Sequence, residues 1–332
     1  YHPILPLLCD NRIAQTAMPR VTLPTASFCH AEDARAQIRR GMQYFKEIFG
    51  FTPRGMWPSE GSVSNESLGI IAECGIGWIA SDEEILAKSL DGGLGDHKER
   101  LYRPWRFVSQ YGEVGAFFRD HQISDLVGFT YSHWDAGRAV GDLCVRLLAI
   151  KSRIGSEGRV IPIILDGENA WEYYPDNAYD FLQGMYRGIA ELPGLNLTTC
   201  SEVLAHNRFD GRLHTIHPGS WINANYGIWI GHPEENLAWD LLSKARYAAV
   251  SGNPTVSAAL ASGAPPTDVT AELICRSLYA AEGSDWFWWY GDDHFSPHSD
   301  RFDRLFRQHL MNVYRLLGQD FPRELREPIK KR

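Results

Sequence analysis

The first half of the chain alternates between helical and extended hydrophobic patterns. From Ala31 to Phe49 apolar residues recur three and four positions apart, which predicts a helix ending at Gly50. Further helices are predicted over residues 65–74, 136–154 and 177–191, and strands over residues 76–80, 114–118 and 160–166. Such alternation is typical of an α/β protein whose helices cover a parallel sheet.

Acidic residues recur where the strands end. The apolar run 160–165 leads directly into Asp166, and a short extended run leads through Trp57 to Glu60. Asp82 and Asp120 follow the other two strands. Because the carboxyl ends of parallel strands share one face of a (β/α) barrel, we expect these groups at that face. Two such acids can split a glycosidic bond, one protonating the leaving oxygen and the other attacking or assisting.

After about residue 205 the pattern changes to amphipathic helices without clear strands. Helices are predicted over residues 234–250, 268–281 and 299–317, joined by turn-rich linkers at 251–254 and 262–266. The sequence therefore predicts a catalytic barrel over residues 1–205 and an α-helical bundle over residues 206–332 that completes the substrate cleft. The basic tail 330–332 is expected to be solvated.

Charge and cysteine usage narrow the setting. A net charge of −8 and a pI near 5.8 argue against nucleic acid or an anionic membrane as the main partner. No run approaches the roughly 18 to 20 apolar residues of a membrane span. The chain starts at Tyr1 without a secretory leader, as a fragment or processed chain would. Six singly scattered cysteines argue against a disulfide framework or structural zinc and favour a reducing, cytoplasmic setting.

Aromatic residues are the unusual part of the composition. Eleven Trp, fourteen Tyr and fifteen Phe make up 12% of the chain, and several Trp lie in polar segments. Sugar rings stack on aromatic faces, so a Trp-rich polar cleft suits a carbohydrate. Residues 284–294 combine three Trp with four acidic or His neighbours and are expected to close over the barrel mouth. The segment 219–226, with Trp221, has the same character.

Each carboxylate also has other interpretations. Ser62 or Ser64 is suited to cap the next helix, with Glu60 as an acid near its N-terminus. Asp166 is equally suited to accept hydrogen bonds from loop N–H groups. It could also bind a metal together with Glu168 and a histidine such as His121 or His133, but no His-x-x-x-His or His-Glu-x-x-His spacing is present. Asp120, His121 and His133 fit either a site or a structural role.

Several segments together resemble glycoside hydrolase family 57, the α-glucan-active family of amylases, amylopullulanases, 4-α-glucanotransferases and branching enzymes. Met56–Glu60 is similar to the family's third motif, Asp166–Glu168 to its fourth and Ser284–Trp288 to its fifth. The opening His2–Leu7 resembles the stretch that follows the second motif. The first motif (His-Gln-Pro) and the second (Gly-x-x-Glu) are missing.

The resemblance implies a (β/α)7-type barrel, incomplete at its N-terminus, followed by a helical bundle. It implies a retaining mechanism with Glu60 as nucleophile and Asp166 as general acid/base, their carboxyls about 5 to 5.5 Å apart. An upstream part of the same protein would complete the barrel. The α-glucan is expected to contact His2, Trp57, Asp120, His121, His133, Glu168, Trp171, Trp221, Asp285, Trp286 and Trp288. No metal or cofactor is expected.

Two other classes remain open at this stage. A metal-dependent carbohydrate deacetylase on a related barrel would need an Asp and two His on one metal. A non-catalytic glucan-binding protein would keep the aromatic platforms without hydrolysis.

Overall fold

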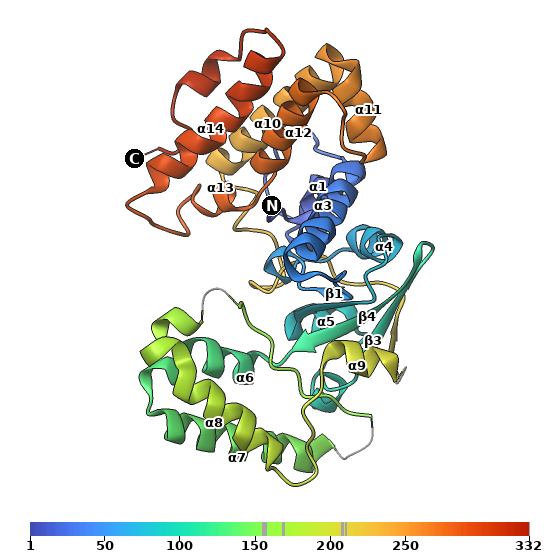
Figure 1. Cartoon of the computed structure of the whole chain (residues 1–332), viewed down its shortest axis with the longest axis vertical. Coiled ribbons are helices and arrows are strands. Elements are labelled where there is room, and N and C mark those ends of the chain that lie inside the picture. Colours follow the sequence, from blue (N-terminus) through green and yellow to red (C-terminus); the bar gives the residue numbers. More distant parts are fainter. Residues whose placement is uncertain (155–157, 168–169, 207–208, 210, 332) are drawn as a thin grey trace. The chain divides into compact units, whose positions relative to one another are not determined.

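The computed structural model describes residues 1–154, 158–167, 170–206, 209 and 211–331. It divides into two compact units (Figure 1). The helical unit comprises Tyr1–Pro53, Pro58–Gly75 and His217–Arg332, and the sheet unit comprises Arg54–Trp57 and Ile76–Ile216. Segments from both ends of the chain thus build one unit. The predicted domain division at residue 205 follows the chain differently and stays a prediction.

Among the described residues, the sheet unit holds one five-stranded sheet of order β1-β2-β4-β3-β5. Its strands are β1 (Gly55–Met56), β2 (Trp78–Asp82), β3 (Trp105–Ser109), β4 (Gly112–Arg119) and β5 (Gly211–Leu213). The pairs β1–β2, β2–β4 and β3–β5 are parallel, and β3–β4 is antiparallel. The predicted parallel α/β sheet is therefore confirmed, with one antiparallel pair added.

Close packing fixes the first pair of strands. Gly55 of β1 faces Trp78 of β2, and a Cβ at Gly55 would lie 1.9 Å from the indole ring. Only glycine fits at this position. In β4, the six residues from Val114 to Arg119 are all buried, as expected for a strand covered on both faces.

The prediction of a strand over residues 160–166 is wrong. These residues run without regular secondary structure and lie outside the described sheet. Pro162 has no N–H to donate to a ladder, so the run is a poor central strand despite its apolar side chains. The predictions also missed β3, whose hairpin with β4 turns at Gln110–Tyr111, and β5, which lies in the region expected to lack strands.

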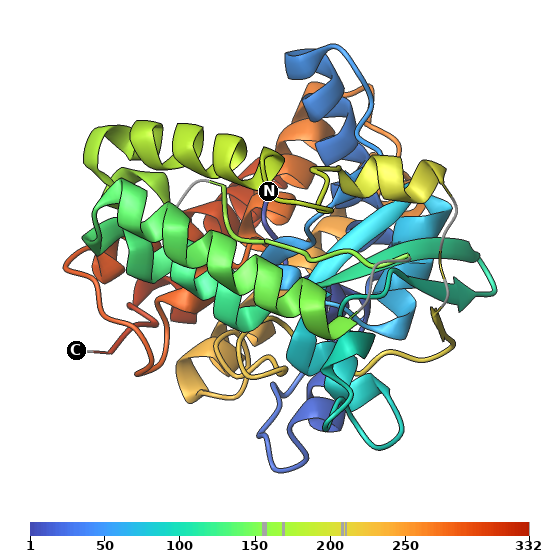
Figure 2. The same ribbon diagram turned by 90° about the horizontal axis from the view of Figure 1, so that it is seen from below.

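Two helices of the sheet unit follow their predicted positions, α7 (Ala136–Ile154) and α8 (Tyr179–Ala190). The shorter helices α5 (Glu83–Ser89), α6 (His121–Asp125) and α9 (Cys200–Ala205) were not predicted. Helices α7 and α8 lie side by side (Figures 1 and 2). Leu143 and Leu147 of α7 share a buried apolar cluster with Phe181 and Met185 of α8.

The helical unit confirms the predicted C-terminal helices. Its elements are α1 (Leu5–Cys9), α2 (Ala14–Ala17), α3 (Ala31–Phe49), α4 (Asn65–Glu73), α10 (Pro233–Gly252), α11 (Pro254–Ser262), α12 (Val269–Ala281), α13 (Asp285–Trp288) and α14 (Ser299–Leu316). A buried ion pair joins its distant segments: the Arg246 guanidinium on α10 donates to Asp33 on α3 at 2.5 Å.

The basic tail, expected to be solvated, is so only in part: Lys331 is exposed, whereas Lys330 is 21% exposed, and Arg332 lies outside the described residues. Ile329 is 2% exposed, and its N–H donates to Asp303 of α14 at 2.9 Å. The Lys330 ammonium donates to the Gly291 carbonyl. The apolar residue before the tail anchors it, which a count of basic residues does not reveal. In the part of the chain that the structure describes, no helix has the length and apolar character needed to cross a bilayer.

Candidate active site

Glu60 has a strained backbone. It lies in the turn Ser59–Gly61 with φ 57° and ψ 26°, the left-handed region that non-glycine residues rarely adopt. Such conformations cost about 1–3 kcal/mol and concentrate at functional sites, where neighbouring contacts enforce them. The Glu60 side chain is half-buried.

Trp221 makes two of the contacts that hold Glu60. The Trp221 backbone N–H donates to the Glu60 carbonyl at 2.9 Å, and its indole Nε1–H donates to Glu60 Oε2 at 2.8 Å. The structure therefore brings together two predicted site residues that lie 161 positions apart.

The loop that carries Trp221 is itself fixed against the segment after Glu60. Gly219 pairs with Val63 in an antiparallel bridge, and the buried Tyr226 hydroxyl donates to the Val63 carbonyl at 2.6 Å. Asn223 and Ala224, at the tip, both have positive φ. Strained residues thus occur on both sides of the Glu60–Trp221 contact.

Helix capping does not explain Glu60. Ser64 caps α4, forming a reciprocal pair of hydrogen bonds with Ser67, and the acid in the first turn of this helix is Glu66. Glu60 lies before the cap. The capping interpretation therefore applies to Ser64 alone.

The fifth-motif segment is joined to the start of the chain. His2 Nδ1 and the Ser284 hydroxyl lie 2.8 Å apart, and the Ser284 N–H donates to the His2 carbonyl at 2.8 Å. Asp285 follows and is exposed. The structure thus brings His2 together with the residue directly preceding Asp285.

The two tryptophans of α13 have different surroundings. Trp288 stacks on His294 with ring centroids 3.9 Å apart and an interplanar angle of 14°. Trp286 instead donates its indole N–H to the Ala280 carbonyl and packs against Phe306 and its α14 neighbours. Trp288 therefore takes part in face-to-face ring stacking, whereas Trp286 packs against α14, and substrate contact by either residue stays a prediction.

In the sheet unit, Asp82 and Arg119 form a buried charged pair at the ends of β2 and β4. Asp82 is 0% exposed, and its Oδ2 lies 3.4 Å from Arg119 Nε and 3.6 Å from His121 Nε2. Burial raises the pKa of Asp82 to about 6. Asp125 also pairs with Arg119. Of this group, only His121 was expected to bind substrate.

Asp120 has a structural role. It is 1% exposed, its Oδ1 caps α6 by accepting from the Ile123 N–H, and its Oδ2 accepts from the Tyr102 hydroxyl at 2.5 Å. Lys98 Nζ also lies 3.7 Å from Oδ2, and substrate contact by Asp120 stays a prediction. His133 is exposed.

The same elements hold the segment that ends at Asp166. The Val160 N–H donates to the Tyr102 carbonyl at 2.9 Å, and the Ile164 N–H donates to the Ser124 hydroxyl of α6 at 3.2 Å. Asp166 itself is half-buried. Glu168 lies outside the described residues.

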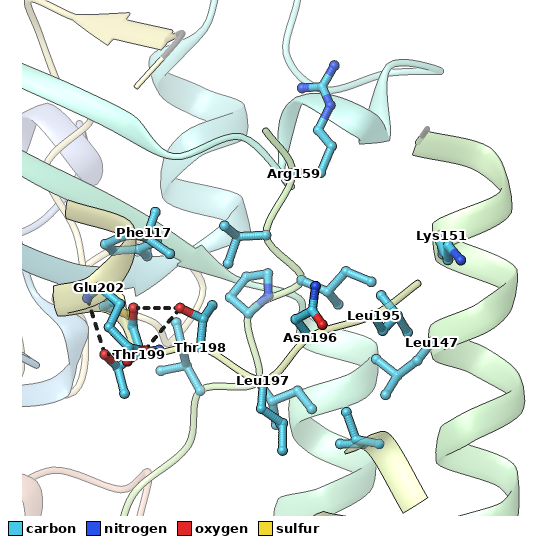
Figure 3. A pocket seen from close by; sticks show the side chains of 18 of the residues that line it. Phe117, Leu147, Lys151, Arg159, Leu195, Asn196, Leu197, Thr198, Thr199 and Glu202 are labelled. Atoms are coloured by element: carbon cyan, nitrogen blue, oxygen red, sulfur yellow. Dashed lines mark hydrogen bonds between the residues drawn. The ribbon is translucent and has the colours of Figure 1, made fainter. Parts of the chain in front are cut away.

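An apolar cavity of about 850 Å³ lies beside this segment (Figure 3). Its wall includes Ile161, Ile163, Leu195 and Leu197, with Trp171 among the lining residues. Glu202 points toward Thr199, with which it forms the cap of α9. Neither Glu60 nor Asp166 lines this cavity.

Trp57 is half-buried directly after β1, in the sheet unit, whereas Glu60 belongs to the helical unit. Asp166 belongs to the sheet unit as well. The separation of the Glu60 and Asp166 carboxyls therefore stays a prediction. Within the described ranges, no group of three or more His, Cys, Asp or Glu side chains is arranged to hold a metal.

Residues 1–215 match the family model described as Glycosyl hydrolase family 57. No curated protein matches the chain. Three solved structures share its fold. A family 57 branching enzyme from Thermococcus kodakaraensis has a TM-score of 0.70 at 16% identity, over 98% of this chain and 67% of its own. A 4-α-glucanotransferase from Thermococcus litoralis has a TM-score of 0.61 at 16% identity, over 86% and 46%. The α-amylase AmyC from Thermotoga maritima has a TM-score of 0.64 at 18% identity, over 89% and 66%.

These likenesses confirm the predicted fold class, a (β/α)7-type barrel fold followed by a helical region. At identities of 16% to 18% they establish the fold alone. The chain spans 46% to 67% of the lengths of these three proteins.

Proposed function

The chain belongs to glycosyl hydrolase family 57, and we propose that it is the part of a retaining α-glucan hydrolase or transglycosylase that carries the nucleophile and the general acid/base. The observation that carries the proposal is the strained Glu60, whose carboxylate oxygen accepts the Trp221 indole N–H. A strained backbone and a hydrogen bond from a loop 161 positions away are both unexpected for a surface acid that has no function.

In the proposed mechanism, Glu60 attacks the anomeric carbon while protonated Asp166 donates its proton to the departing glycosidic oxygen. A covalent glycosyl-enzyme forms. Asp166 then removes a proton from water, or from an acceptor sugar hydroxyl, and the oxygen so activated displaces Glu60. The Trp221 indole N–H orients the Glu60 carboxylate for attack, which lowers the entropic cost of reaching the reactive geometry.

The glucan substrate would stack on Trp288 and contact His2 and Asp285 at the other end of the same segment. The names of the similar structures support this substrate class, since they are a branching enzyme, a 4-α-glucanotransferase and an amylase. Their reactions differ in whether water or a sugar accepts the glycosyl group.

The test is Glu60→Gln in the intact natural protein, incubated with maltooligosaccharides and with pullulan. We expect turnover to fall by at least about a thousandfold while glucan binding persists, because only the nucleophile is lost. Longer products in the wild-type reaction identify transfer, and shorter ones identify hydrolysis. Glu66→Gln, an exposed acid on α4, is the matched control. Undiminished turnover in Glu60→Gln would remove the assignment. Binding without any wild-type turnover would identify a glucan-binding protein instead.

A further inference from the structure

The two rings of the Trp288–His294 stack are joined by a short turn with exposed side chains. Trp288 ends α13, and His294 lies six positions later, after the turn 291–293. Asp292 has a 96% exposed side chain, and Phe295, just beyond the stack, is 90% exposed. Trp288 lies against the buried Trp229, but the exposed part of the turn itself gains little from apolar burial.

Two buried glutamates at the start of α10, Glu234 and Glu235, contact this turn at Gly291. The Gly291 N–H donates to Glu234 Oε2 at 2.9 Å. Glu235 is 0% exposed, and a Cβ at Gly291 would lie 2.9 Å from its Oε1. Gly291 has a φ of +70°, so this close approach depends on glycine twice, once for space and once for backbone conformation.

Lys330 and Lys331 also form hydrogen bonds with this turn and with Glu234. The Lys330 ammonium donates to the Gly291 carbonyl and lies 3.4 Å from Glu234 Oε2. The Lys331 N–H donates to Glu234 Oε1 at 2.6 Å. Both peptide groups of Gly291 are thus bonded to an ion pair, and the Glu234 carboxylate bridges helix, turn and tail.

We propose that the Glu234–Lys330 ion pair is a positioning device for glucan binding: it holds the turn at Gly291 and thereby sets the Trp288–His294 stack as a sugar-binding platform. The inference rests on the proposed function, because it takes Trp288 as a surface on which a glucose ring stacks. Glu234 and Lys330 act through the turn and do not touch the sugar. Charged hydrogen bonds suit this role because they are directional and are worth more than neutral ones.

The experiment compares Lys330→Met and Glu234→Gln with wild type, using maltoheptaose as the ligand and substrate. We expect KM and the dissociation constant to rise about three- to tenfold with kcat within about twofold, as for a loss confined to binding. The two substitutions combined should have little more effect than either alone, since they remove one device. Lys244→Met, which breaks an exposed ion pair with Glu324 in the same unit, is the control.

A spectroscopic readout tests the geometry directly. A sugar that stacks on Trp288 changes the fluorescence of this indole, so adding maltoheptaose at constant pH should give a step in the wild-type emission, and Trp288→Ala should reduce that step. We expect the step to shrink in Lys330→Met. Lys330 is 21% exposed, so this variant serves where Glu234→Gln yields too little folded protein.

The outcomes separate the two claims. If Trp288→Ala weakens maltoheptaose binding but Lys330→Met changes neither binding nor the fluorescence step, the positioning role is wrong and the proposed function stands. A lower melting temperature with unchanged KM would likewise reduce the pair to a structural role. If Trp288→Ala leaves binding unchanged, the platform itself is wrong.

Discussion

Buried carboxyl groups in this protein differ in what surrounds them, and the surroundings decide their charge. Asp33 meets the Arg246 guanidinium directly. Glu235 is as deeply buried, but among the described residues its Oε1 has no hydrogen-bond partner. Burial, together with the nearby charges of Asp293 and Glu234, raises the pKa of Glu235 to about 8, although the His232 N–H and Lys330 act in the opposite direction. Glu235 is therefore a neutral acid at pH 7.

This gives a pH dependence with a defined sign. Between the ordinary pKa of 4.5 and about 8 the folded protein binds a proton that the unfolded chain has lost. Stability therefore falls as the pH rises through this window. We expect Glu235→Gln to melt at the wild-type temperature at pH 4 and above it at pH 9, as measured by calorimetry. Glu324→Gln, an exposed acid, should show no such divergence. Parallel curves for Glu235→Gln and wild type would contradict the assignment.

At the scale of elements, an acid at the end of a strand fits either an active site or the N-cap of the next helix, and the sequence could not distinguish the two. Asp82 and Asp120 do follow β2 and β4, as predicted, but each caps the next helix by accepting a backbone N–H. Long helices such as α3 and α7 were predicted well because their apolar periodicity extends over several turns, whereas short helices such as α5 and α6 were missed. The run before Asp166 was misread because apolar composition alone does not supply a ladder, and Pro162 cannot donate to one.

The cap of α4 can be tested by itself. Ser64 and Ser67 exchange hydrogen bonds between side chain and backbone at the start of this helix. We expect Ser64→Ala to lower the free energy of unfolding by about 1 kcal/mol, the usual worth of a helix N-cap. Urea unfolding measures the change. Ser277→Ala, which removes only a hydroxyl bonded to the Leu273 carbonyl within α12, should be neutral. An effect of similar size in both variants would argue against the cap.

For the whole molecule, the decisive contacts join segments far apart in the chain. Trp221 reaches Glu60 across 161 positions, and Arg246 reaches Asp33 across 213. Both partners of the first pair were recognisable from local sequence, as an acid after a Trp-Pro turn and a Trp in a polar loop. Their contact was not, because it depends on how N-terminal and C-terminal segments build one unit.

The Arg246–Asp33 pair allows us to predict how much contacts between the N-terminal and C-terminal segments stabilise the helical unit. Arg246→Met would leave Asp33 buried without its cation, beside Glu282, whose pKa burial already raises. Removing one partner of a buried pair costs about 3–5 kcal/mol. We expect urea unfolding to show a loss of this size, and the double variant Arg246→Met/Asp33→Asn to recover part of it. No recovery would mean that packing of the Arg246 stem, rather than charge pairing, stabilises the unit.

The positions of Lys330 and Lys331 also have a consequence for biosynthesis. The Gly291 carbonyl accepts one hydrogen bond from Lys330, which is synthesised 39 positions later, and the Lys331 N–H donates to Glu234. A nascent chain in which α10 and α13 have already left the ribosome would still lack the tail contacts that hold the Trp288–His294 stack. If the ion pair positions the stack as proposed, Lys330 and Lys331 must be synthesised before the chain can bind a sugar at Trp288.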